Sequence, residues 1–329
     1  MQTQSLPPQA VIFDMAWGHF RARLLETFTT LGVPDAIAAG RDPGVNERFL
    51  RACASMGLLE RTPAGYKLTE VGNVLRADVP DSMRSLALAF LAPSSGMYRA
   101  WENLAFSAKT EGDAFVHTMG EHIWDYYTKT NPEEGRQFNQ LMQGLSAGVL
   151  GAILERYALP ESGIVVDVGG GVGTMLCAFL NKQPGLRGIV VDMEATRAGA
   201  EEYIASQGLQ DRCAFQSGNF FEAVPAGGDL YTMKWILHDW NDERAAAILR
   251  TVHAAMPAHA KLALFEAVVP EDDSIANSAR MMDMNMMVVC GGKERSEEDW
   301  RALLDANGFR LDRIVPTPTP NFVIEASKK

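Results

Sequence analysis

The sequence Ile164–Gly173, I-V-V-D-V-G-G-G-V-G, decides the fold of this chain. An apolar run that ends in a glycine-rich turn is typical of a buried parallel strand followed by a helix, which we expect to begin at about Thr174. Glycine adopts positive φ angles readily and lets a ligand approach the main chain closely. The N-terminus of the following helix adds free N–H groups and a partial positive charge. The stretch therefore predicts a loop that receives a nucleoside-bearing cofactor.

The spacing of the glycines indicates which cofactor. Dinucleotide-binding loops usually read G-x-G-x-x-G, whereas this loop has Gly169, Gly170, Gly171 and Gly173 and then a threonine. Led by Asp167, the pattern resembles the first motif of S-adenosylmethionine (SAM) methyltransferases. A carboxylate would attract the cationic methionine end of SAM and would offer little to a pyrophosphate. A tight turn without a ligand is the simpler alternative, but so many glycines would then destabilise the loop.

A second carboxylate supports a nucleoside site. Asp192 ends the next apolar run, Val190-Val191. A carboxylate at the tip of the second strand can bind both ribose hydroxyls. NAD and SAM both carry a ribose, so Asp192 does not distinguish them. Taken alone, it would also fit the N-cap of the following helix.

Length and composition restrict the class of protein. The chain has 329 residues, enough for about two domains, and its 47% apolar and 22% charged residues are typical of a globular enzyme. A net charge of −11 argues against a nucleic-acid partner. The four cysteines form no C-x-x-C pair, which argues against a zinc site and a disulfide framework. Without a long apolar run or a signal peptide, we expect a cytoplasmic protein with no membrane association.

The N-terminal part reads as mostly helical. We expect one helix over residues 10–31 and another over 46–59, then a hairpin of Leu58–Thr62 and Tyr66–Leu68. This order predicts a winged-helix unit. Residues 121–157 read as helices broken at Asn131-Pro132.

From Ile164 onward, strands and helices alternate, which predicts an α/β fold with a doubly wound parallel sheet. The expected strands are residues 164–168, 188–192, 212–216, 229–235, 260–268, 309–315 and 320–326.

Two further motifs resemble one family closely. They are K-W-I-L-H-D-W-N-D, beginning at Lys234, and G-G-K-E-R-S, from Gly291 to Ser296. Both resemble the SAM-dependent small-molecule O-methyltransferases, which include the plant caffeic acid, chalcone and isoflavone enzymes and bacterial relatives that act on phenazines, anthracyclines and other polyketide-like aromatics. The resemblance implies a Rossmann-like class I methyltransferase sheet over residues 159–329, a winged-helix dimerisation domain over 1–100, and connecting helices over 101–158 that cover the acceptor pocket.

The resemblance also implies the cofactor site. Asp167, Gly169, Gly171 and Gly173 would surround the methionine part of SAM, Asp192 would take the ribose, Asn219 and Phe220 would flank the adenine, and Lys234 would lie near that ring. Asn219 departs from the aspartate usual in the family, but an amide oxygen can still accept a hydrogen bond from the adenine amino group. Residues 40–46 are also shorter than in relatives, through either a truncated winged helix or an absent loop.

For catalysis, the resemblance implies His238 as general base, Glu266 and Glu294 as the residues that orient it, and Asp239 as a contact to the acceptor. The chemistry is consistent with this. A phenol has a pKa near 10 and is mostly protonated at pH 7, and a histidine with a pKa of about 6.5–7 is well matched to removing its proton. His238 follows an apolar strand at its carboxyl end, where ligands of doubly wound sheets bind.

The acceptor pocket is less defined by the sequence. Met282 and Met286 belong to a methionine cluster that fits either a helix core or a pocket for a flat aromatic. Phe138 and Met142 lie one helical turn apart on the helix that covers the acceptor in the family. The acceptor's identity, and methylation of oxygen or of nitrogen, stay open.

The N-terminal helix favours a homodimer, because Val11, Ile12, Met15, Phe20 and Leu24 give it more apolar surface than a short capping helix needs.

Three other functions remain as alternatives: a SAM-binding hydroxylase or decarboxylase, an NAD(P) oxidoreductase, and a winged-helix regulator that senses a small molecule. The intact His238 with its two glutamates, the glycine spacing and the acidic charge, respectively, disfavour them.

Overall fold

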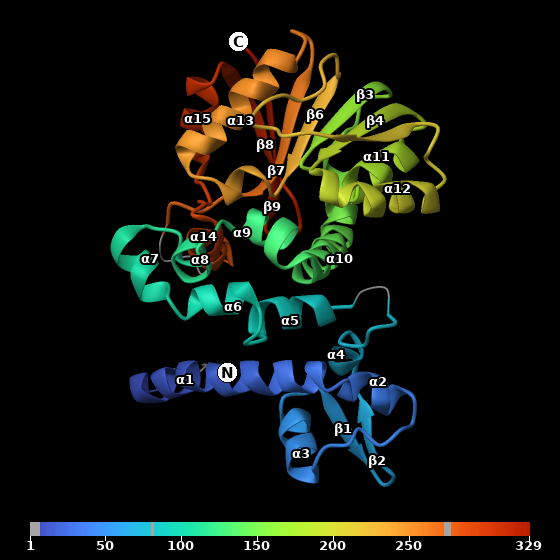
Figure 1. Cartoon of the computed structure of the whole chain (residues 1–329), viewed down its shortest axis with the longest axis vertical. Helices are drawn as coiled ribbons and strands as arrows, with labels where there is room; N and C mark the ends of the chain where they lie inside the picture. The colour runs from blue at the N-terminus through green and yellow to red at the C-terminus, as the bar shows by residue number, and fades with distance from the viewer. Residues whose placement is uncertain (1–6, 80–81, 273–277) are drawn as a thin grey trace, which may run out of the picture. The chain divides into compact units, whose positions relative to one another are not determined.

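A computed structural model describes residues 7–79, 82–272 and 278–329. The chain divides into two compact units, Met1–Arg99 and Ala100–Lys329 (Figure 1). In the parts of the chain that the structure describes, every helix is too short or too polar to cross a membrane.

The N-terminal unit has the order of elements predicted from the sequence. Pro8 stands in the first turn of α1, where its missing N–H costs nothing. The helix predicted over residues 46–59 is shorter than expected, because Gly57 has a φ of 77° and the chain turns there into the hairpin. The elements are α1 (Pro8–Thr30), α2 (Val33–Ala38), α3 (Glu47–Ser55), β1 (Leu59–Thr62), β2 (Gly65–Leu68), α4 (Glu70–Asn73) and α5 (Arg84–Leu91).

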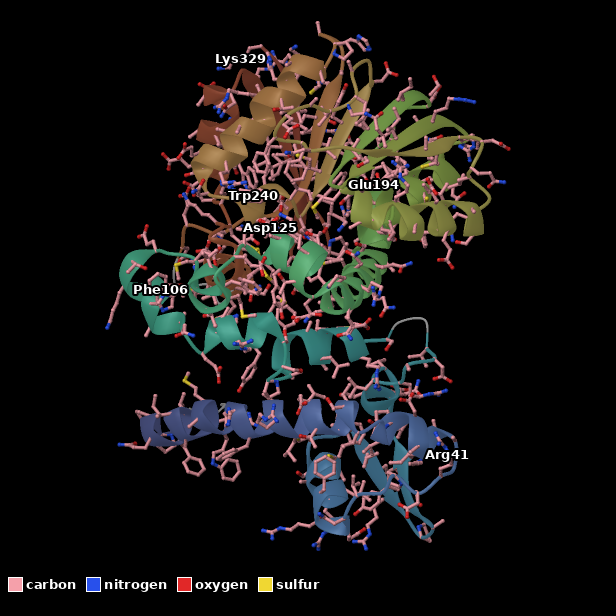
Figure 2. All side chains as sticks on the ribbon, in the orientation of Figure 1. Arg41, Phe106, Asp125, Glu194, Trp240 and Lys329 are labelled. Carbon is pink, nitrogen blue, oxygen red and sulfur yellow. The ribbon has the colours of Figure 1, made fainter. Side chains whose placement is uncertain are left out.

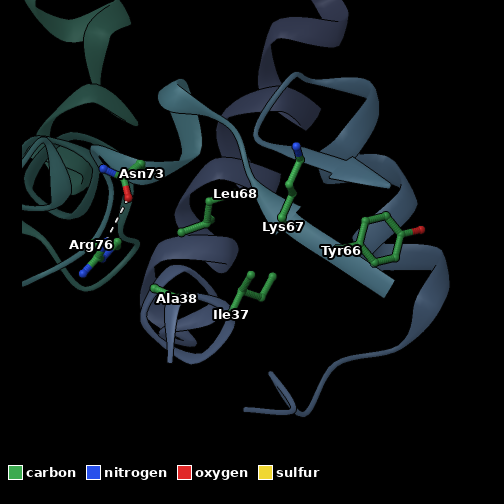
Figure 3. Close-up of a pocket in the computed structure, with 7 residues that line it drawn as sticks. All are labelled: Ile37, Ala38, Tyr66, Lys67, Leu68, Asn73 and Arg76. Atoms are coloured by element: carbon green, nitrogen blue, oxygen red, sulfur yellow. Dashed lines mark hydrogen bonds between the residues drawn. The ribbon is translucent and has the colours of Figure 1, made fainter. Parts of the chain in front are cut away.

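The short segment before Asn46 connects α2 directly to α3, and the unit still closes a core around Phe28, Leu50 and Leu59. A cavity of about 240 Å³ lies beside the hairpin (Figure 3). Its wall is made of Ile37, Ala38, Tyr66, Lys67, Leu68, Asn73 and Arg76, and so includes none of the predicted site residues.

The connecting segment is helical, with the predicted break. The side chain of Asn131 accepts the N–H of Glu134, and Pro132 begins the long helix that follows. A single π-helical turn precedes the break. The elements are α6 (Gly96–Trp101), α7 (Leu104–Thr110), α8 (Ala114–Met119), α9 (Ile123–Asp125), η1 (Tyr126–Thr130) and α10 (Pro132–Arg156).

A seven-stranded sheet forms the centre of the second unit, in the order β5-β4-β3-β6-β7-β9-β8. All seven predicted strands are present: β3 (Ser162–Val168), β4 (Gly185–Asp192), β5 (Cys213–Ser217), β6 (Leu230–Lys234), β7 (Lys261–Ala267), β8 (Phe309–Pro316) and β9 (Asn321–Lys328). The first five are parallel, as predicted. The last two form an antiparallel hairpin, because residues 317–320 are too few for a crossover.

Helices cover both faces of this sheet (Figure 1). They are α11 (Thr174–Lys182), α12 (Arg197–Ser206), α13 (Asp242–Ala255) and α15 (Glu297–Ala306), whereas α14 (Ser278–Cys290) contacts α7, α8 and the turn Leu237–Asp239. Neighbouring strand residues serve opposite faces: Val165 packs with the core under α11 and α12, whereas Val166 packs with the core under α13 and α15. The continuous apolar runs of the sequence follow from this two-sided burial.

Candidate active site

The order of the strands locates the site. Within the sheet, the chain passes from β3 to β4 and β5 on one side and then to β6 and β7 on the other, so the order of the strands reverses between β3 and β6. Ligands of open α/β sheets bind outside the carboxyl ends of the strands at such a point. The glycine loop follows β3, and His238 follows β6.

The glycine loop has the backbone that its sequence predicts. Gly169, Gly171 and Gly173 have φ angles of 69°, 57° and 85°, a region that other residues avoid. A Cβ at Gly169 would lie 2.4 Å from the Ile236 side chain, whereas one at Gly171 would meet no atom within 4 Å. The loop is therefore packed against the segment that follows β6 at Gly169 and open at Gly171, where a cofactor can approach the main chain.

Asp167 lies beneath this loop. Its side chain is buried, and its Oδ1 accepts the hydroxyl of Thr232 at 2.7 Å. Its Oδ2 is buried without a hydrogen-bond partner among the described residues. Burial raises the pKa of Asp167 to about 6, against the opposing effects of Thr232 and Lys234. A buried carboxylate oxygen without a donor fits a cationic group of a cofactor, such as the ammonium group of SAM.

Asp192 ties the end of β4 to the glycine loop. Its Oδ2 accepts the N–H of Gly171 at 2.8 Å, and its Oδ1 accepts the N–H of Met193 at 2.7 Å. Oδ1 also accepts the hydroxyl of Thr196 at 3.2 Å, so the second lone pair of Oδ2 remains. Asp192 can therefore hold the loop and still accept a hydrogen bond from a ribose.

The three residues expected near the adenine have different surroundings. Asn219 makes a local turn, in which its Oδ1 accepts the N–H of Phe221 at 3.1 Å and its Nδ2 donates to Glu222 at 2.8 Å. Phe220 packs against Phe221, with the ring centroids 5.0 Å apart. The Nζ of Lys234 lies 3.7 Å from the ring centroid of Trp235.

Burial lowers the pKa of Lys234 to about 8, although the carboxylates of Asp167, Glu266 and Asp239 oppose this shift.

A strained residue leads from β6 into the turn that carries His238. Trp235 has a φ of 56°, which is rare for a bulky side chain. Its indole Nε1 donates to Oδ1 of Asn321, on β9, at 2.6 Å. The chain then forms a 3₁₀ turn, Leu237–Asp239.

The structure brings all four predicted catalytic residues together. The Nδ1 of His238 lies 2.7 Å from Oε1 of Glu294 and 3.7 Å from Oε2 of Glu266, and its Nε2 lies 3.5 Å from Oδ1 of Asp239. All four side chains are buried. Glu266 has a second task, since its Oε1 accepts the N–H groups of Ile236 and Leu237 at 3.0 Å each.

The pKa expected for the base is not that of the structure. Burial alone lowers the pKa of His238, but the carboxylates of Glu294, Glu266 and Asp239 outweigh it and raise the pKa to about 10. A pKa of about 6.5–7 was expected for the base, because the resemblance named these acidic residues but not their distances from the imidazole. Burial also raises the pKa of Asp239 to about 7, against the opposing effect of His238.

The same cluster has the composition of a metal site. One ligand atom from each of His238, Glu266 and Glu294 lies within 4.8 Å of the others. The sequence led us to expect no metal, so this expectation needs a direct test.

Three residues of the G-G-K-E-R-S motif hold the His238 turn, and the sequence did not single them out. A Cβ at Gly292 would lie 2.1 Å from the carbonyl oxygen of His238, so only glycine fits there. The N–H of Lys293 donates to the same carbonyl at 2.9 Å. The fully buried Arg295 donates to the carbonyls of Leu237 and Trp240, at 2.9 Å each. The position of Arg295 directly after Glu294, a predicted orienting residue, was the sequence feature that could have indicated this role.

The residues expected at the acceptor belong to two helices. Phe138, on α10, packs against Tyr127 and Trp124, with centroid distances of 5.1 and 5.5 Å. Met142 is half-buried one turn later.

On α14, Met286 is buried and its carbonyl accepts the N–H of Gly292 at 3.0 Å, whereas Met282 is 38% exposed. Met286 thus connects α14 to the His238 turn, and Met282 is the more open of the two. The nearby Trp240, labelled in Figure 2, stacks on His122 at a centroid distance of 5.1 Å.

Comparison with known proteins agrees with this architecture. Residues 101–310 match the family described as an O-methyltransferase domain. The O-demethylpuromycin O-methyltransferase of Streptomyces alboniger is 38% identical, over 97% of this chain and 89% of that protein. The 8-amino-8-demethylriboflavin N,N-dimethyltransferase of Streptomyces davaonensis is 30% identical, over 88% and 83%.

A solved structure adds the ligands of a relative. The O-methyltransferase of neocarzinostatin biosynthesis, in complex with SAM and 2-hydroxy-5-methyl naphthoic acid, has a TM-score of 0.80 and 29% identity, and covers 94% of this chain and 96% of that chain. The family match and the identity along nearly the whole sequence show that the chain belongs to the O-methyltransferase family and that its methyl donor is SAM.

Proposed function

We propose that this O-methyltransferase transfers the methyl group of SAM to a phenolic hydroxyl of a small, flat aromatic compound, with His238 as the general base. The proposal rests on the buried cluster of His238 with Glu294, Glu266 and Asp239 at the carboxyl end of β6. Glu294 engages Nδ1 of the imidazole at 2.7 Å, which leaves Nε2 to accept a proton. Relatives named for phenazine and mitomycin support an aromatic acceptor.

In the proposed reaction, His238 and Glu294 handle the proton of the acceptor hydroxyl. When bound, SAM supplies the methyl group and a positive charge on sulfur. Nε2 of His238 takes the proton of the hydroxyl as the oxygen becomes a nucleophile, and Glu294 stabilises the imidazolium that results. Because the neighbouring carboxylates raise the pKa of His238, the imidazole must lose its own proton before it can act. A positive charge near the cluster favours that loss.

For the cofactor, we propose that Asp167 binds the methionine end, Asp192 the ribose, and Asn219, Phe220 and Lys234 the adenine side. The unpartnered Oδ2 of Asp167 and the open space at Gly171 support this assignment.

We place the acceptor against Phe138 and Met142 of α10 and Met282 and Met286 of α14. Methionine and aromatic side chains adapt to flat apolar ligands, and Met286 is hydrogen-bonded through its carbonyl to the loop that holds His238.

Methylation of an aromatic amine is the second candidate. The N,N-dimethyltransferase from Streptomyces davaonensis supports it, since that relative is 30% identical over 88% of this chain. An aromatic amine is already nucleophilic as the neutral base, so transfer to it would depend far less on His238.

A panel assay separates these functions. The protein is incubated with methyl-labelled SAM and matched phenols and anilines, with and without a chelator. We expect label on phenols, no effect of the chelator, and a kcat about 10²–10⁴-fold lower in His238→Ala, with SAM affinity unchanged. Label on anilines alone, or full activity of His238→Ala on an un-ionised phenol, would contradict the proposal. Loss of activity with the chelator would instead assign a metal to the cluster.

We also propose a homodimer formed through α1. Ile12, Phe13, Met15, Trp17 and Phe20 are 65%, 59%, 69%, 48% and 58% exposed on this helix. Phe13 and Trp17 pack side by side, with ring centroids 4.9 Å apart. So much apolar surface on one helix favours burial against a second copy.

A further inference from the structure

Arg295 is the largest charged side chain that is fully buried among the described residues. Its guanidinium makes contacts in four directions. Nη1 donates to the carbonyls of Leu237 at 2.9 Å and Lys293 at 3.1 Å, and Nη2 donates to the carbonyl of Trp240 at 2.9 Å. Nε donates to Oδ1 of Asp242 at 2.9 Å. The plane of the group is therefore fixed by both main chain and side chain.

The three carbonyl groups lie around the turn that carries His238. Leu237 and Trp240 flank His238 and Asp239 in the sequence, and Lys293 donates its own N–H to the carbonyl of His238. On the other side of the turn, Glu266 accepts the N–H groups of Ile236 and Leu237. An anion thus holds the N–H groups of the turn and a cation holds its carbonyls. The backbone of His238 has little freedom between them.

Stability alone does not account for this arrangement. A buried ion pair is weak support for a fold, because desolvation offsets most of its attraction. Among the described residues, Arg295 is paired with one carboxylate, that of Asp242, whose side chain is 57% exposed, so a large part of that attraction is screened. What a guanidinium supplies is direction: five donors in a rigid plane, which a lysine cannot reproduce.

We propose that Arg295 is a positioning residue that fixes the direction of the His238 imidazole. The inference rests on the proposed role of His238 as base. Arg295 touches no reacting atom in this scheme; it acts by holding the two carbonyls that flank His238–Asp239.

The test uses Arg295→Lys and two acceptors from the phenol panel. One phenol is un-ionised at the assay pH, and the other is its nitro derivative, which is ionised. A wrongly oriented imidazole lowers kcat only for the un-ionised phenol, because the ionised phenol has no proton to remove. We expect kcat to fall about 10–100-fold on the un-ionised phenol and less than about threefold on the ionised one, with the Kd of SAM unchanged. Equal losses on both acceptors, or none on either, would overturn the proposal.

Arg212→Lys is the matched control. Nη1 of Arg212 also donates to three main-chain carbonyls, those of Leu180, Pro184 and Leu186, at 3.1, 3.3 and 3.1 Å, but these lie at α11 and β4. It should lower both activities equally or neither.

A second variant covers the case in which Arg295→Lys does not fold. Asp242→Asn removes the charged partner of Arg295 at a half-exposed position. It should give a smaller loss with the same preference for the un-ionised phenol, and a uniform loss or no loss counts against the inference. His238→Ala is measured alongside. If His238→Ala loses equal activity on both phenols, His238 is not the base. If His238→Ala loses more activity on the un-ionised phenol but the Arg295 and Asp242 variants do not, His238 is the base and only the positioning role of Arg295 is wrong.

Discussion

The Nδ1 atom of His238 lies 2.7 Å from Oε1 of Glu294, although 56 positions separate the two residues in the sequence. The short distance fixes which ring nitrogen is available for a proton. It also places a negative charge beside an imidazole that Glu266 already approaches to 3.7 Å. The Glu294 carboxylate therefore both orients the imidazole and raises its basicity. A substitution that removes the charge of Glu294 but keeps the shape of its side chain can separate the two effects.

Glu294→Gln makes that separation. The amide keeps an oxygen for Nδ1 but removes a charge that raises the pKa of His238. Only the neutral imidazole accepts a proton, so the rate rises with pH through this pKa, and a lower pKa moves the rise to lower pH. We expect a shift of roughly one pH unit or more, and a lower plateau because a weaker base remains. The measurement is kcat/KM from about pH 6 to about pH 11, which spans the rise in both proteins. An unmoved rise would mean that another group titrates.

Asp192→Ala tests the cofactor site. Asp192 holds the N–H of Gly171 at 2.8 Å and is assigned to the ribose, so its loss should weaken SAM binding by about 1.5–3 kcal/mol. Titration calorimetry with SAM measures this directly. Asp211→Ala, an exposed change just before β5, serves as the control and should leave the affinity unaltered. Equal affinities for the two variants would remove Asp192 from the site.

Gly292→Ala should destabilise the protein and damage catalysis together. The new Cβ would lie 2.1 Å from the carbonyl oxygen of His238, and that carbonyl is part of a clamped turn that cannot move cheaply. We expect the free energy of unfolding to fall by about 1–3 kcal/mol and kcat to fall with it. Gly148→Ala gives the contrast: the position is exposed on α10 with nothing within 4 Å, so stability should rise by about 0.5–1 kcal/mol. Urea unfolding measures both, and the same sign for both changes would refute the packing argument.

Substitutions on α1 should shift the oligomeric state. Phe13→Ser with Phe20→Ser removes two rings that are 59% and 58% exposed, and should convert dimers to monomers in light scattering at micromolar concentration. Val71→Ser, at a 60% exposed position on α4, should leave the mass unchanged. A parent protein that is already monomeric would rule the interface out.

Local sequence patterns predicted the sheet well because its central strands, such as β3 and β6, contain short apolar runs. The glycine loop, Asp192 and His238 also follow directly from strand ends, which the pattern marks. What the pattern could not show depends on residues distant in sequence. Arg295 reaches Leu237, 58 positions away, and its role is invisible in either segment alone.

The pKa expected for His238 was too low for a similar reason, because Glu266 and Glu294 come from distant segments and lie 3.7 and 2.7 Å from its Nδ1, beside the neighbouring Asp239. The helix expected to reach residue 59 ends at Ser55 because the positive φ of Gly57 overrides the helical spacing of apolar residues.

The strained backbone at Trp235 has a consequence for biosynthesis. Its indole is held by Asn321, which lies in β9, the last strand of the sheet, and β9 pairs directly with β7. During translation, more than 80 residues are added after Trp235 before this partner exists. The turn that carries His238 thus acquires this support only after β9 has been synthesised. A ribosome-bound or prematurely terminated chain can contain every proposed catalytic residue and still lack the Trp235–Asn321 hydrogen bond that supports the His238 turn.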